Sequence, residues 1–155
     1  TYDYDLYGKN AQRYYEYYMD ENGERTRAMN GACGHITTFY TVTNVHEELF
    51  IDENDKPFTI DAGYAMYQYE NDENGNVTWE GYFNAFGGAV TGPDGYSSVE
   101  RSFDTFGRMI GERYLDNRNK LTNGPEGFAG WNGYYDENGS LVVTSRYDKD
   151  LNDMM

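Results

Sequence analysis

Hydrophobic and polar residues alternate along short segments of this chain, which is the pattern of β-strands that bury one face. The alternation is plainest in the segment 76–83, where it predicts one face with Val77, Trp79 and Phe83 and another with Thr78, Glu80 and Tyr82. Segments of similar chemistry lie at 96–103, 108–115 and 140–147. Helical periodicity is weak, and only the stretch 10–18 tolerates a helix, which we do not favour. The pattern predicts an all-β protein.

Acidic and amide residues recur between these segments at a fixed spacing. One series has a 32-residue period and consists of Asp20, Asp52, Asn84, Asp116 and Asp148. A second series has the same period, falls twenty positions after the first, and consists of Asp72, Asp104 and Asp136. Gly, Asn or Asp stands three residues after the first four members of the first series and after every member of the second: Gly23, Asp55, Gly87, Asn119, Gly75, Gly107 and Gly139. These residue types tolerate a left-handed backbone, so each D-x-x-G motif predicts a tight turn. Self-similarity of this kind is typical of repeat architectures.

When the 32-residue units are aligned, residues at equivalent positions form columns, and two further columns show a constant kind of residue. Glycine stands at Gly31, Gly63, Gly95 and Gly127, and small residues follow at Cys33, Ala65, Ser97 and Ala129. Short connections join antiparallel neighbours, so each unit should contain two longer strands and one short strand. The predicted fold class is therefore all-β, an antiparallel β-hairpin repeat array, solenoid or spiralling sheet, with a 32-residue period.

A single repeat domain is expected over residues 1–155, with units at roughly 20–51, 52–83, 84–115 and 116–147 and partial units at 1–19 and 148–155. The motif DLYG at 5–8 predicts a further turn, and its 15-residue distance from Asp20 implies an insertion of three residues. Irregular ends are typical of capping repeats, and they also fit a fragment of a longer repeat protein.

The net charge of the chain disfavours some classes of binding partner. It carries 27 acidic and 12 basic residues, a formal net charge of −15. Phosphate binding needs clustered Lys and Arg, so we expect no nucleic acid and no anionic membrane surface as a partner. No apolar run approaches the roughly 18 residues that a membrane span requires, so we expect no membrane insertion. The 17 tyrosines suit a thin sheet, because tyrosine buries its ring while its hydroxyl stays wet.

The sequences around the D-x-x-G turns resemble those of a known family. The stretches SFDTFGRMI at 102–110, GYYDENGSL at 133–141 and YENDENGNV at 69–77 resemble the YD-type (Rhs-like) repeats of bacterial surface and toxin proteins. The resemblance spans nearly the whole chain through a short motif. It implies long antiparallel sheets that spiral into shells or stalks, a non-catalytic role for the repeats, and a location outside the bacterial cell or on its surface.

A looser likeness is to the aromatic repeats with which secreted bacterial proteins bind cell-wall or glucan chains. The stretches YFNAFGGAVTG at 82–92 and YLDNRNKLTNG at 114–124 are similar to those repeats. The regular tryptophan of that family is missing, and the spacing here, which alternates between twenty and twelve positions, differs from its more uniform period. The likeness implies carbohydrate as a partner without naming the ligand.

One repeat column couples a carboxylate to an aromatic ring two residues later. The glutamates are Glu16, Glu48, Glu80 and Glu112, and the rings are Tyr18, Phe50, Tyr82 and Tyr114. Residues two apart on a strand share a face, so ring and carboxylate should point the same way. Two interpretations follow: a row of sugar-binding subsites, or aromatic residues needed for packing between strands with a solvated acidic face.

The two tryptophans do not share a column. Trp79 alternates with Val77 and Phe83, so we expect it in the core. Trp131 lies between small residues in GWNG at 130–133, close to a turn, and is the better candidate for an exposed ring. The candidate ligand-binding set is therefore Tyr18, Tyr82, Tyr114, Trp131, Glu16, Glu80 and Glu112.

Metal and catalytic chemistry have little support. Asp72, Asn74 and Asn76 approach the start of a calcium loop without its distant Glu, and an Asx-turn explains the same residues. Calcium is thus a possible cofactor and no other is expected. Cys33 and His35 could suggest a thiol nucleophile, but Cys33 falls in the small-residue column, so a packing role is the simpler account. We expect no enzyme activity.

For function, we expect a non-catalytic binding module of a bacterial surface or secreted protein that recognises neutral carbohydrate through exposed aromatic residues. The alternative is a structural spacer, stalk, fibre or shell element, whose partner is another copy of itself. A degenerate hydrolase is a third hypothesis. A binding module should place several of the candidate rings in a concave exposed row, whereas a structural element should bury them between strands.

Overall fold

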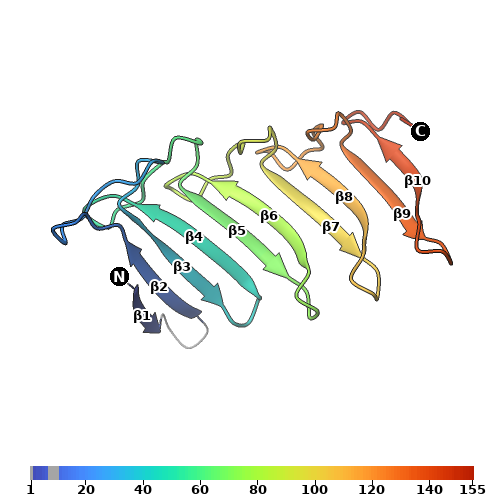
Figure 1. Ribbon diagram of the computed structural model, residues 1–155. Helices are drawn as coiled ribbons and strands as arrows, with labels where there is room; N and C mark the ends of the chain where they lie inside the picture. The colour runs from blue at the N-terminus through green and yellow to red at the C-terminus, as the bar shows by residue number, and fades with distance from the viewer. Residues whose placement is uncertain (1, 7–10) are drawn as a thin grey trace.

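The computed structural model of the chain describes residues 2–6 and 11–155, and in this part it forms one open antiparallel sheet without helices (Figure 1). The ten described strands are β1 (Tyr2–Leu6), β2 (Ala11–Tyr17), β3 (Gly34–Tyr40), β4 (Val45–Ile51), β5 (Met66–Asn71), β6 (Val77–Phe83), β7 (Ser98–Phe103), β8 (Met109–Leu115), β9 (Gly130–Tyr135) and β10 (Leu141–Tyr147). Neighbours in the chain are neighbours in the sheet throughout. The predicted all-β hairpin array is confirmed.

The connections differ at the two ends of the strands. Short turns close the hairpins β3–β4, β5–β6, β7–β8 and β9–β10 at one end, and longer connections join successive hairpins at the other end (Figure 1). The predicted strand segments agree with the observed ones to within two residues, and the stretch 11–17 is a strand. The predicted turn at 5–8 is not covered, because residues 7–10 lie outside the described part.

The predicted third strand of each unit does not form. Each longer connection instead returns to the preceding strand through a single bridge, such as Ile51 with Pro57 and Phe83 with Ala89. The chain then bends at a second turn, in which the N–H of Gly63 or Gly95 donates to the carbonyl three residues earlier. One bridge is too little to define a strand. After it, the second half of each connection leaves the preceding strand and folds over the sheet.

The Asp and Asn marks close their turns with the same hydrogen bonds. Oδ1 of Asp72 accepts the backbone N–H of Asn74 and of Asn76, each at 2.9 Å. The same pair of bonds occurs in eight turns, which begin at Asp20, Asp52, Asp72, Asn84, Asp104, Asp116, Asp136 and Asp148. Such donors hold the pKa of Asp116 below its usual value. Within the described residues, the predicted D-x-x-G turns are confirmed as Asx-turns.

The fourth residue of these turns lies in the left-handed region. Gly75 and Gly107 have φ of 81° and 78°. Asp55 and Asn119 hold the same place with φ of 62°, which both residue types tolerate. Leu151 is the exception, because its φ of 65° is one that a leucine rarely adopts.

A β-bulge corrects the predicted alternation in β6. Glu70 lies opposite Trp79 and Asn71 opposite Val77, so Thr78 is an extra residue, and its hydroxyl donates to the carbonyl of Glu70 at 3.3 Å. The bulge moves Val77 away from the face of Trp79, because an unpaired residue interrupts the period of two. Local alternation could not show this, since a bulge is visible only in the partner strand.

The two faces of the sheet differ in what covers them. We call the face that carries Tyr82, Val99 and Tyr114 the ring face, since antiparallel partners share a face and Val99 pairs with Tyr114. We call the opposite face, which carries Trp79 and the paired residues Gly81 and Ser98, the groove face. A buried cluster packs on the ring face and consists of Tyr96, Val99, Tyr114, Phe128 and Trp131. A second cluster contains Ala32, Phe50 and Ile60.

Candidate functional site

The predicted aromatic residues belong to one row of rings that crosses the sheet. Ring centroids lie 6.2 Å apart for Tyr18 and His35, 6.3 Å for His35 and Phe50, and 6.0 Å for Phe50 and Tyr64. The row continues with Tyr64–Tyr82 at 4.8 Å, Tyr82–Tyr96 at 6.4 Å and Tyr96–Tyr114 at 4.9 Å. The structure therefore brings Tyr18, Tyr82 and Tyr114 into one row, in tilted and edge contacts that favour packing between rings.

The longer connections cover these rings. A Cβ placed on Gly92 would lie 2.4 Å from the ring of Tyr82, and one on Gly124 would lie 2.5 Å from the ring of Tyr114. The backbone of these two connections thus lies directly on a tyrosine ring, and only glycine fits there. Backbone hydrogen bonds hold the connection in place, since the N–H of Gly92 donates to the carbonyl of Tyr96 at 2.8 Å.

The expected exposure of Trp131 is wrong. Its side chain is only 9% exposed, and its indole N–H donates to Oε1 of Glu112 at 3.1 Å. The flanking glycines suggested an open ring, but Trp131 pairs with Glu112 across β8 and β9 and so lies on the ring face, in the buried cluster. Tyr114 is equally buried, at 9%. Tyr18 and Tyr82 are half-buried.

The expected core position of Trp79 also needs correction. The indole is half-buried and lies outside both buried clusters. It lies over Gly81, because a Cβ at that residue would be 2.6 Å from the ring. Trp131 is therefore more buried than Trp79, which is the opposite of the order that the sequence suggested.

The predicted glutamates bind other side chains of the ring face. Glu80 accepts a hydrogen bond from the Tyr67 hydroxyl and forms an ion pair with Arg101. Arg101 also pairs with Glu112 at 3.2 Å, which extends the network to Trp131. The Arg101 side chain is 18% exposed, so this network is shielded from bulk water. Opposite charges thus link three neighbouring strands, β6, β7 and β8.

The remaining glutamate of the set forms a similar pair at the other end of the sheet. Oε2 of Glu16 lies 3.1 Å from Nε2 of His35. The Tyr18 hydroxyl lies 3.1 Å from the other ring nitrogen of the same histidine. Glu16, Glu80 and Glu112 therefore have protein partners at the positions where hydroxyl groups of a sugar were expected.

Burial changes the acidity of the ring-face tyrosines. It raises the pKa of Tyr82 to about 12, with the nearby Tyr96 and Tyr64 adding to the effect. Burial, followed by the negative charge of Glu112, raises the pKa of Tyr114 to about 12. Burial and the hydrogen bond to Glu80 raise the pKa of Tyr67 as well. Each hydroxyl loses water around its charged form, which disfavours ionisation.

The calcium candidates form an Asx-turn. Oδ1 of Asp72 accepts two backbone N–H groups, and Oδ2 accepts the side-chain N–H of Asn76 at 3.1 Å. Within the described residues there is no group of three or more His, Cys, Asp or Glu side chains placed to hold a metal ion. Cys33 is 3% exposed, as expected for its small-residue column, whose other members Ala65, Ser97 and Ala129 are also buried.

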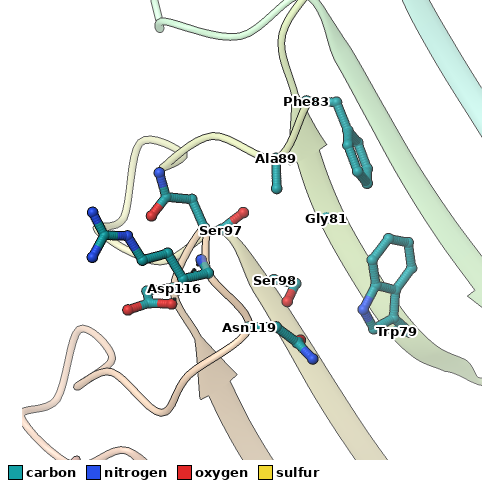
Figure 2. A pocket seen from close by; sticks show the side chains of 10 residues that line it. Trp79, Gly81, Phe83, Ala89, Ser97, Ser98, Asp116 and Asn119 are labelled. Atoms are coloured by element: carbon teal, nitrogen blue, oxygen red, sulfur yellow. Dashed lines mark hydrogen bonds between the residues drawn. The ribbon is translucent and has the colours of Figure 1, made fainter. Parts of the chain in front are cut away.

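A groove that the sequence did not predict lies on the groove face where β6 meets β7. Its volume is about 380 Å³. Figure 2 shows Trp79, Gly81 and Phe83 along β6, with Asp116 and Asn119 of the turn after β8 across from them. Ser98 of β7 lies between the two sides. The sequence does carry a signal for this groove, since Gly81 stands where Leu49 and Tyr17 stand one and two repeats earlier.

Comparisons with known proteins add no family to these observations. No protein-family model matches the sequence, and no curated protein matches it. The described part of the chain has no helix of the length and apolarity needed to cross a membrane.

Proposed function

We propose that the chain is a non-catalytic structural element, a spacer or stalk of a bacterial surface or secreted protein, built from 32-residue hairpin repeats. The observation that carries this proposal is the covering of the aromatic row by the chain's own connections at Gly92 and Gly124. Rings that pack on each other and on backbone hold neighbouring hairpins together, and the covered faces of Tyr82 and Tyr114 are closed to a ligand. Each unit is stabilised by contact with the next, as in solenoid proteins.

The charge network supports the same role. Arg101 of β7 pairs with Glu80 of β6 and Glu112 of β8, so it joins two successive hairpins. Each hairpin alone would leave its rings and its charges unpartnered, because the contacts reach across to the neighbouring strands. Such an array grows in length with the number of units, and length is what a spacer supplies.

Deletion of one unit tests the proposal. Removal of residues 84–115, one full repeat, should give a folded protein in which Phe83 leads into Asp116. The sheet loses two strands, so its longest dimension should fall by about 10 Å, at about 4.8 Å per strand. Small-angle X-ray scattering measures this length, and circular dichroism reports the sheet.

A matched deletion provides the control. Removal of residues 84–99, half of a unit, takes out the connection after β6 and the first two residues of β7, so Phe83 would run into Glu100 without a turn, and it should prevent folding. Unfolding of the full-unit variant, or an unchanged longest dimension, would contradict the repeat array and with it the spacer role.

A further inference from the structure

We propose that the groove between β6 and β7 binds a neutral carbohydrate, with one sugar ring stacked on Trp79. This site goes beyond the structural role proposed above and lies on the opposite face from the aromatic row. Its volume of about 380 Å³ lies within the range of roughly 300–1,000 Å³ that is usual for small-molecule sites. Its lining combines the rings of Trp79 and Phe83 with the polar groups of Ser98, Asp116 and Asn119.

The groove is open because small residues occupy two positions that are filled elsewhere in the chain. Gly81 and Ala89 stand in the groove, and the residues two repeats earlier are Tyr17 and Arg25. There the guanidinium carbon of Arg25 lies 3.8 Å from the centroid of the Tyr17 ring. The chain therefore stacks a flat polar group of its own on an aromatic ring at that place. In the β6–β7 groove this group is absent, and Trp79 supplies the ring.

The turn beside each position determines which charge is accepted. Arg25 is held by the carboxylate of Asp55 at 2.6 Å and by the carbonyl of Glu53 at 3.1 Å. The residues two repeats later are Asn119 and Asn117, so an amide replaces the carboxylate that holds Arg25, and an uncharged residue stands where Glu53 offers its carbonyl. An amide donates and accepts hydrogen bonds without carrying a charge. The groove is thus suited to uncharged hydroxyl groups, which also donate and accept.

The charged residues of the groove are balanced. Asp116 and Arg118 both line it, one with each sign. Oδ1 of Asp116 accepts the backbone N–H of Arg118 at 2.8 Å and of Lys120 at 3.0 Å, so Oδ2 is the oxygen that can accept a hydroxyl hydrogen. The two charges offset each other, so the groove offers little net attraction to a cation or an anion, whereas a neutral polyhydroxylated ligand can use both side chains for hydrogen bonds.

Trp79 provides the surface on which a sugar can stack. The face of an aromatic ring carries partial negative charge, and the axial C–H groups of a pyranose carry partial positive charge. The Trp79 and Phe83 rings have centroids 6.1 Å apart and planes inclined by 47°, so they form two sides of a shallow trough. Two inclined rings suit a puckered ring, whereas a quaternary ammonium group needs a cage with more walls.

The first experiment uses the whole chain on an immobilised array of neutral glycans, and then titrates each bound glycan in solution. Tryptophan fluorescence should change saturably, because a stacked sugar removes water from Trp79. Trp79→Ala should weaken binding at least about tenfold, which corresponds to the loss of one stacking contact. Phe106→Ala removes a ring that is 81% exposed at a hairpin turn, and it should leave binding unchanged.

A second variant closes the groove without removing its ring. Ala89→Arg introduces at this position the residue that fills the corresponding place as Arg25, and Ala89 is exposed, so the fold should tolerate the change. Binding should be lost although Trp79 is retained. Circular dichroism spectra equal to that of the unmodified chain show that each variant is folded.

Three outcomes would overturn the proposal. The first is a blank array together with no fluorescence change at millimolar soluble oligosaccharide. The second is binding that survives both Trp79→Ala and Ala89→Arg, which places the sugar elsewhere. The third is saturable binding of choline or of an anionic glycan in preference to neutral sugars. None of these results bears on the deletion of residues 84–115, so the site and the spacer role are tested separately.

Discussion

The two tryptophans lie in the same sheet and have opposite surroundings. Trp131 is on the ring face, 9% exposed, with its N–H bound to Glu112. Trp79 is on the groove face, half-buried, beside an open groove. The difference comes from the connections between hairpins, which place Tyr96 and Phe128 in the buried cluster that contains Trp131. In this array the course of the connections, more than the residue type, decides which aromatic residues are packed and which stay open to solvent.

The largest expected effect separates the two tryptophans directly. Trp131→Ala should lower the free energy of unfolding by about 3–5 kcal/mol, since it leaves a cavity in a packed cluster. Trp79→Ala should lower it by only about 1 kcal/mol, because the ring is partly in water already. Urea unfolding of both variants measures the difference. Equal losses would mean that the two faces are packed alike.

Ion pairs on the two faces give the next contrast. Arg101→Ala should lower the free energy of unfolding by about 2–3 kcal/mol, because it leaves the carboxylates of Glu80 and Glu112 on the ring face without the cation that pairs with both. Arg113→Ala breaks a pair with Glu100 on the groove face, where the side chains are 50% and 42% exposed. That loss should be about 0–1 kcal/mol. Urea midpoints test the contrast, and a larger loss for Arg113→Ala would reverse the assignment of the faces.

Alkaline pH should act on the ring face first. In the unfolded chain tyrosine ionises near pH 10, whereas the folded pKa of Tyr82 and of Tyr114 is raised to about 12. Between these values the unfolded chain binds fewer protons than the folded one, so stability is complete below about pH 10 and falls as the pH rises toward 12. Chemical unfolding at a series of pH values measures this loss.

Tyr82→Phe and Tyr114→Phe in one variant provide the control. The alkaline loss of stability should become smaller in that variant, since two of the shifted groups are gone. A loss of the same size would show that other tyrosines carry the effect.

The smallest difference between two paired variants is expected at the turns, which serve both faces equally. Asp136→Ala removes the oxygen that accepts the N–H groups of Asn138 and Ser140, each at 2.9 Å, and should cost about 1–2 kcal/mol. Asp136→Asn keeps an acceptor, as Asn84 does in its own turn, and should cost less than half as much. Thermal unfolding of the two variants tests this order.

The sequence predicted what depends on local chemistry. The strands and the Asx-turns follow from alternation and from the place of Asp, Asn and Gly, because a few neighbouring residues determine them. The bulge at Thr78 and the burial of Trp131 could not be predicted in this way, since both depend on partners in other strands. The third strand failed because each connection keeps one bridge before it bends.

The groove could not be predicted from local sequence patterns for a related reason. Its two sides come from β6 and from the turn after β8, which lie about one full repeat apart in the chain. The sequence signal is the small size of Gly81 and Ala89, which stand where larger side chains occur in other repeats. Such a signal does not appear in the alternation of hydrophobic and polar residues. A comparison of side-chain volume along each repeat column would have found it.

Quenching of tryptophan fluorescence by acrylamide tests the central claim most directly. Trp131→Phe leaves Trp79 as the single tryptophan, and Trp79→Phe leaves Trp131. If the connections close the ring face and leave the groove face open, acrylamide will quench Trp79 several times more strongly than Trp131 in folded protein. Equal quenching, or stronger quenching of Trp131, would contradict the account.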